Sequence, residues 1–148
     1  MSAVLQSNLE RRQFNQHLVA ELQEERHQVW SFYCKVAEQK PFSCSYEMQS
    51  LLTQFSQLLI DYVSLGHFGV YERLLSGTER RDGVLTTAKN LYIEFSQITE
   101  SVMSFNDKYD DNKHTLNVDE LETDLSGLGE QLAKRIDIED KLCHLVLE

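Results

Sequence analysis

Ionisable side chains interrupt the apolar pattern of one stretch, residues 61–75, which reads DYVSLGHFGVYERLL. Asp61, His67 and Glu72 lie there among leucine, valine and aromatic residues at roughly helical spacing. Carboxylates and histidines that converge inside a helical bundle are the groups that bind metal ions in such proteins. Leaving one of these charges buried and unpaired would cost about 3–5 kcal/mol. We therefore expect other parts of the chain to supply partners for these groups.

Two further segments carry charged residues where an apolar residue is expected. In the predicted helix of residues 8–39, Glu25 and Arg26 interrupt the apolar face. In the predicted helix of residues 118–147, Glu139 interrupts the apolar face. We predict that the interrupting groups form one hydrogen-bonded cluster inside the protein, because each unpaired member would be costly. The members of this predicted cluster are Arg26, Asp61, His67, Glu72 and Glu139. The alternative for Asp61 and Glu72 is that each side chain extends to solvent.

The spacing of these groups does not fit a known metal site. A di-metal carboxylate bundle needs two Glu-x-x-His pairs, and the chain has only the pair formed by Glu24 and His27. His67 and Glu72 are five residues apart, which does not place them on one face of a regular helix. No nucleotide-binding or hydrolase motif occurs. We predict no metal, no cofactor and no catalytic residue, with a metal-dependent or ligand-sensing helical bundle as the alternative.

The elements that must position these groups are all helical by sequence. A capping-box spacing at Ser7 and Glu10 marks the first helix start, and Pro41 requires this helix to end before Lys40. Gly66 is expected to kink or break the second helix. The helices are predicted near residues 8–39, 46–75, 84–109 and 118–147. The fold class is therefore all-α, an antiparallel four-helix bundle that forms a single domain over residues 1–148.

Composition excludes several classes of function. The chain has 148 residues with a formal net charge of −10, which argues against direct nucleic-acid binding. Such acidity favours a basic partner, and it also serves solubility in many proteins. Three cysteines without paired spacing suit a reducing compartment. Without an export signal or a long apolar run, the expected location is the cytoplasm, away from the membrane.

The stretch at residues 61–75, with LQEER at 22–26 and EDKLCHLVLE at 139–148, resembles the Rsd/AlgQ family of bacterial regulators that bind the primary sigma factor. The family pattern D-Y-hydrophobic-S-x-G-H-F-x-hydrophobic-Y-E is nearly complete, and its E-D-x-L close is also present. The motif and cluster residues that we single out are Arg26, Asp61, Tyr62, His67, Phe68, Tyr71, Glu72, Glu139 and Asp140.

The resemblance implies a function in transcription. It implies a helical bundle that holds the C-terminal, promoter-reading domain of the housekeeping sigma factor and keeps it from core RNA polymerase and the −35 element. It also implies one-to-one binding, a role in stationary phase, no enzyme activity and no cofactor. The residues that contact sigma stay unknown at this point. Trp30 and Tyr33 are candidates for an apolar centre of that interface, although both fit a core position equally well.

Overall fold

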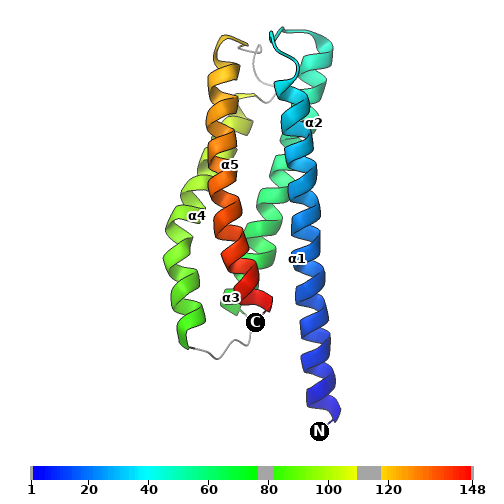
Figure 1. Ribbon diagram of the computed structural model, residues 1–148, viewed down its shortest axis with the longest axis vertical. Coiled ribbons are helices and arrows are strands. Elements are labelled where there is room, and N and C mark those ends of the chain that lie inside the picture. Colours follow the sequence, from blue (N-terminus) through cyan, green and yellow to red (C-terminus); the bar gives the residue numbers. More distant parts are fainter. Residues whose placement is uncertain (1, 77–81, 110–117, 148) are drawn as a thin grey trace.

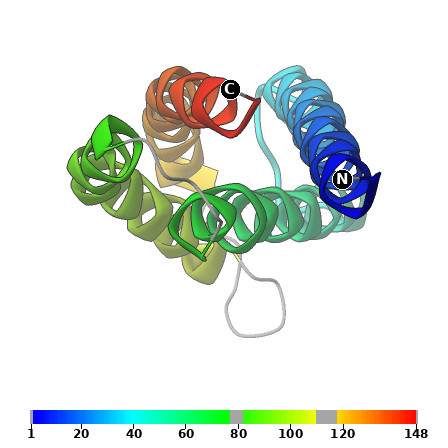
Figure 2. The ribbon, with the colours of Figure 1, turned by 90° about the horizontal axis from the view of Figure 1, so that it is seen from below.

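The computed structural model describes residues 2–76, 82–109 and 118–147, and all regular structure among them is helical. Four helical arms lie side by side, and consecutive arms run in opposite directions (Figure 1). Seen along the bundle, the arms surround a common centre (Figure 2). The elements are α1 (Ser2–Ala37), α2 (Tyr46–Ser64), the π-helix η1 (Leu65–Tyr71), α3 (Glu72–Ser76), α4 (Asp82–Lys108) and α5 (Val118–Leu147). The predicted all-α antiparallel four-helix bundle is confirmed.

The first helix starts earlier than the sequence suggested. Helix α1 begins at Ser2, so Ser7 lies inside it and the predicted capping-box start near residue 8 is wrong. Residues 2–7 contain no glycine or proline, and alanine, leucine and glutamine favour continuation of a helix. The helix ends at Ala37, before Pro41 as predicted. Its N-terminal part projects beyond the ends of the other arms (Figure 1).

The second arm changes its type of helix near Gly66. Helix α2 starts at Tyr46, where the Ser45 hydroxyl caps it by accepting a hydrogen bond from the backbone N–H of Met48 at 3.1 Å. Its α-helical hydrogen bonding ends at Ser64, and η1 continues the arm with π-helical bonding until α3. The predicted interruption near Gly66 is therefore a change of hydrogen-bond pattern, and a kink there stays a prediction.

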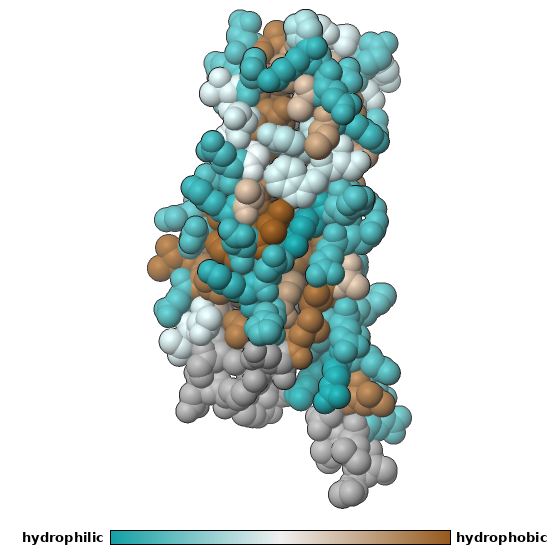
Figure 3. All heavy atoms as spheres, viewed as in Figure 1, coloured by the Kyte–Doolittle hydropathy of each residue, from teal (hydrophilic) through white to brown (hydrophobic). Residues whose placement is uncertain are grey.

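Apolar side chains from all four arms fill the centre of the bundle. Leu22 of α1, Leu52 and Phe55 of α2, Phe95 of α4 and Leu132 of α5 are fully buried. Hydrophilic side chains cover most of the face seen in Figure 3, with apolar side chains exposed between them. None of the described helices is long and apolar enough to cross a membrane.

Candidate functional site

An ion pair lies inside the bundle on α5. Arg135 and Glu139 are one helical turn apart, and Nε of Arg135 donates to Oε2 of Glu139 at 2.8 Å. Their side chains are 0% and 1% exposed. Charges buried this deeply are stable only when their remaining polar atoms also find partners. The neighbouring helices supply those partners.

Two side chains from other arms bind the second oxygen of Glu139. Nη2 of Arg26, in α1, donates to Oε1 at 3.1 Å, and the Tyr62 hydroxyl, in α2, donates to the same oxygen. Nη1 of Arg26 donates to Oδ1 of Asp140 at 3.0 Å, at the solvent-exposed rim. Both oxygens of Glu139 are therefore occupied by donors from within the protein.

Arg135 uses its other nitrogens to contact two further arms. Nη1 donates to the hydroxyl of Thr99 in α4 at 2.6 Å, and Nη2 donates to the backbone oxygen of Val63 in α2 at 3.2 Å. Its Cζ lies 4.1 Å from the centre of the Phe95 ring. We call Arg26, Tyr62, Thr99, Arg135 and Glu139 the central network. It links all four arms of the bundle.

The structure brings only some of the predicted cluster and motif residues together. Arg26, Tyr62 and Glu139 meet in the central network, whereas Asp61 and Glu72 are exposed. The prediction that Asp61 and Glu72 lie inside the cluster is wrong, and the alternative of extension to solvent holds. Tyr62 faces the interior, and successive helical residues point about 100° apart, so Asp61 cannot share its direction.

Glu25, the neighbour of Arg26, takes no part in the central network. Burial raises the pKa of the Glu25 carboxyl, and the nearby carboxylates of Glu21 and Asp61 raise it further. Of these two neighbouring charged residues of α1, Arg26 is the one that binds the buried Glu139 carboxylate.

His67 packs on the ring of Phe95, which in turn contacts Arg135 of the central network. The half-buried His67 ring lies parallel to Phe95, with 6.3 Å between the centroids and 5° between the planes, and it also stacks on Tyr71 at 6.0 Å. Within the described part of the chain, its buried Nδ1 has no hydrogen-bond partner. The prediction that His67 joins a hydrogen-bonded cluster is wrong. The Phe95 ring packs against both the His67 ring and the Arg135 guanidinium.

Exposed aromatic side chains surround this histidine. Phe68 is 66% exposed and meets the His67 ring edge-on at 4.9 Å, and Tyr92 of α4 is 39% exposed. Tyr71 is buried and stacks on Tyr92 at 5.0 Å. We call Phe68 and Tyr92 the aromatic surface. The rings of Phe68 in η1 and Tyr92 in α4 both contact His67, which packs on Phe95.

Arg135 and Thr99 are the network residues that the sequence reasoning missed. Leu128, Leu132, Arg135, Glu139 and Leu142 are all buried, with successive separations of four, three, four and three residues. The apolar neighbour Ile136 is only half-buried, although the charged Arg135 is fully buried. The available signal was the four-residue separation between Arg135 and Glu139, which allows an ion pair on one helix face.

Trp30 and Tyr33 belong to the bundle and not to an exposed patch. Both are half-buried and pack against the core. The Tyr33 hydroxyl donates to the backbone oxygen of Leu125 at 2.8 Å. Both residues are less exposed than Phe68, and their place in the interface stays a prediction.

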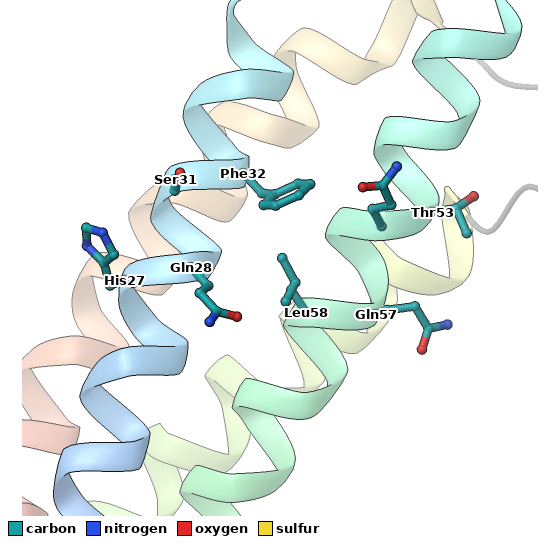
Figure 4. A pocket seen from close by; sticks show the side chains of 8 residues that line it. His27, Gln28, Ser31, Phe32, Thr53, Gln57 and Leu58 are labelled. Atoms are coloured by element: carbon teal, nitrogen blue, oxygen red, sulfur yellow. The ribbon is translucent and has the colours of Figure 1, made fainter.

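A separate cleft of about 410 Å³ lies between α1 and α2 (Figure 4). Phe32 and Leu58 point toward each other between the two helices and provide its apolar surface. The lining residues are His27, Gln28, Ser31, Phe32, Thr53, Gln54, Gln57 and Leu58. Because His27 is the only ionisable residue among the described lining residues, the cleft suits an apolar side chain or a neutral ligand. It shares no residue with the central network.

The donor set of the central network does not suit a cation. Two guanidinium groups already neutralise Glu139, and a metal ion beside them would be repelled. Among the residues that the structure describes, no group of three or more His, Cys, Asp or Glu side chains could hold a metal ion. The geometry of the described residues therefore does not support a metal ion at the central network.

We expect Tyr62 to make the protein less stable at alkaline pH. Burial and the Glu139 carboxylate raise the pKa of Tyr62 above its ordinary value of 10.0. A raised folded-state pKa means that its contribution is complete below pH 10 and is lost as the pH rises further, because the unfolded chain releases the proton first. The wild type should therefore be more stable than Tyr62→Phe at pH 8, and urea midpoints should converge toward pH 11. A constant difference between the two proteins across this range would contradict the assignment.

The fold and the central network define an all-helical bundle protein with a buried, hydrogen-bonded ion pair at its centre. The chain belongs to the Rsd/AlgQ family, because residues 1–147 match the family described as regulator of the RNA polymerase sigma(70) subunit. It is 38% identical over 104 residues to the "Regulator of sigma D" of Escherichia coli O1:K1 and 36% identical to that of Shigella dysenteriae serotype 1. Each match covers 68% of this chain and 63% of the relative. No solved structure matched.

Proposed function

We propose that the protein is an anti-sigma factor that binds the C-terminal, promoter-reading domain of the primary sigma factor one to one. In this role it keeps the domain from core RNA polymerase and the −35 element and thereby regulates transcription. The observation that carries the proposal is the match of residues 1–147 to a family of sigma(70) regulators. The protein acts in the cytoplasm by binding alone, with no catalytic step, no cofactor and no direct contact with nucleic acid or membrane.

The charge of the chain supports a partner of this kind. A promoter-reading domain is basic where it meets DNA phosphates, and this chain has a net charge of −10. Opposite charges on two partners accelerate their encounter and select against wrong partners, more than they increase affinity. An acidic helical bundle is therefore suited to compete with DNA for such a domain.

The aromatic surface is the part of the molecule that best fits the contact. Phe68 lies within the motif that resembles the family pattern, yet 66% of its surface is exposed and the core does not use it. Exposed aromatic residues with few rotatable bonds are preferred anchors of protein interfaces. Asp61 is an exposed acidic residue of the same motif and the same arm. We assign Phe68 as the apolar anchor and Asp61 as an acidic contact for sigma.

Calorimetric titration of the purified protein with the isolated sigma domain tests the proposal. We expect saturable heat with a stoichiometry near one and co-elution of the two proteins in gel filtration at micromolar concentrations. Absence of both heat and co-elution would remove the anti-sigma assignment. An acidic helical protein without the family motif, titrated in the same way, controls for attraction by charge alone.

Salt and promoter DNA should both weaken the complex. Raising the ionic strength screens the attraction between the acidic chain and the basic domain, since the Debye length falls from about 10 Å at 0.1 M salt to about 3 Å at 1 M. The loss should be partial, because an apolar anchor is insensitive to screening. A −35 element duplex should compete for the same sigma residues in a fluorescence anisotropy assay. A complex that binds the duplex without loss of the anti-sigma protein would contradict this geometry.

A further inference from the structure

The π-helical segment lies directly against the Arg135–Glu139 pair. A Cβ atom built on Gly66 would be 2.7 Å from Nη2 of Arg135 and 3.2 Å from Oε2 of Glu139. Real Cβ atoms do not approach neighbours as closely as the first of these distances. The backbone of η1 and the guanidinium group therefore pack together only because residue 66 has no side chain.

Arg135 contacts the chain directly before Gly66 and reaches the chain after Gly66 through Phe95. Nη2 donates to the backbone oxygen of Val63, in the last turn of α2, at 3.2 Å. On the other side, its guanidinium lies 4.1 Å from the Phe95 ring centre, and Phe95 lies parallel to the ring of His67 in η1. One buried side chain thus holds the residue before the change of helix type and supports the ring that packs on the residue after it.

The direction of Phe68 depends on this change of helix type. A π-helix bonds residue i to i+5 and is rare outside single turns, so it needs tertiary contacts to persist against the α-helical alternative. A return to α-helical bonding would rotate each side chain after Ser64 about the helix axis, because fewer residues make up each turn. His67 would then leave Phe95, and Phe68 would no longer point outward from the same place.

We infer that Arg135 is a positioning residue for partner binding: it fixes the π-helical turn so that His67 packs against Phe95 and Phe68 is presented to solvent. Arg135 is fully buried and does not itself touch a partner. The inference rests on the proposed function in taking the sigma domain as that partner. It extends the function by placing a determinant of binding in the centre of the bundle, on a different helix from the contact surface.

Arg135→Lys is the variant that isolates this role. Lysine keeps a positive charge beside Glu139, but its ammonium is a single point charge and cannot reproduce the planar set of donors that reaches Thr99 and Val63. The matched control is Leu121→Ala, a buried position near the start of the same helix. Fourteen residues separate positions 121 and 135, which corresponds to about 21 Å along an α-helix.

Two measurements are compared for the wild type and both variants. We expect Arg135→Lys to weaken binding to the isolated sigma domain about tenfold and to accelerate amide hydrogen exchange in peptides that cover residues 65–71. Leu121→Ala should lower the urea midpoint but leave the affinity and the exchange of residues 65–71 unchanged. Wild-type affinity for Arg135→Lys, or an equal loss for Leu121→Ala, would overturn the inference. If the wild type itself does not bind sigma, the proposed function fails, and the exchange comparison still decides whether Arg135 holds the turn.

A second pair of variants tests the contact between Gly66 and the guanidinium. Gly66→Ala should accelerate exchange of residues 65–71 strongly in the wild type, because the added Cβ displaces Arg135. In the Arg135→Lys background the same substitution should add little, since the displaced group is already absent. An equally large effect of Gly66→Ala in both backgrounds would show that the guanidinium does not determine the conformation of this segment.

Discussion

Replacing Glu139 by alanine is expected to destabilise the protein by about 3–5 kcal/mol, a large fraction of the stability of an ordinary domain. The substitution removes the one carboxylate that pairs with Arg135 among the described residues and leaves a buried guanidinium whose charge is no longer compensated. It also removes the acceptor for Arg26 and for the Tyr62 hydroxyl. Urea denaturation followed by circular dichroism at neutral pH should show a clearly lower midpoint.

The adjacent Asp140 provides the control for this experiment. Asp140 pairs with the same Arg26, but its side chain is 58% exposed, and exposed ion pairs contribute only about 0–1 kcal/mol. Asp140→Ala should therefore leave the midpoint nearly unchanged. Equal midpoints for Glu139→Ala and the wild type would mean that the central network does not hold the bundle together. A double variant, Arg135→Met with Glu139→Leu, should be less destabilised than the sum of its single substitutions.

Replacing Phe68 by alanine is expected to weaken binding to the sigma domain by about 30-fold, which corresponds to the roughly 2 kcal/mol typical of an interface hot spot. The urea midpoint should stay close to that of the wild type, because most of the Phe68 side chain is already exposed in the free protein. Loss of affinity without loss of stability is the signature of a contact residue. Titration calorimetry and urea denaturation of the same preparation measure both quantities.

Tyr46 offers a matched control for Phe68. It is an aromatic residue with 82% exposure, and it begins α2 at the opposite end of the same arm. Tyr46→Ala should change the affinity less than threefold, which is about 0.6 kcal/mol. Equal losses for the two variants would indicate a general effect of surface aromatic residues, and a Phe68→Ala variant with wild-type affinity would move the contact surface elsewhere on the molecule.

The two experiments separate the interior from the surface of one motif. Tyr62 and Phe68 both belong to the segment of residues 61–75, but Tyr62 binds the buried Glu139 and Phe68 faces solvent. If the proposed function is correct, this motif carries one set of residues for the fold and another for the partner. Arg135 connects the two sets, because it contacts Glu139, the Val63 carbonyl and the ring that packs on His67.

The sequence by itself determined the helices, their approximate limits and two members of the central network. Apolar residues at steps of three and four report the face that each helix buries, and this local periodicity survives in any packing arrangement. Pro41 ends α1 by steric conflict within the chain, and Ser45 caps α2 through a hydrogen bond to its own third neighbour. Arg26 and Glu139 were recognisable because each replaces an apolar residue in such a stripe.

Only the tertiary structure decided which charges meet. The burial of Arg135 and the exposure of Asp61 depend on how each helix is rotated about its axis, and neighbouring helices set that rotation. The π-helical bonding of η1 also depends on tertiary contacts. The local preference is α-helical bonding, and contacts with Arg135, Glu139 and Phe95 stabilise the π-helical form. A pattern along one helix gives the direction of a side chain only relative to that helix, so the partner of a buried charge is fixed when four helices pack.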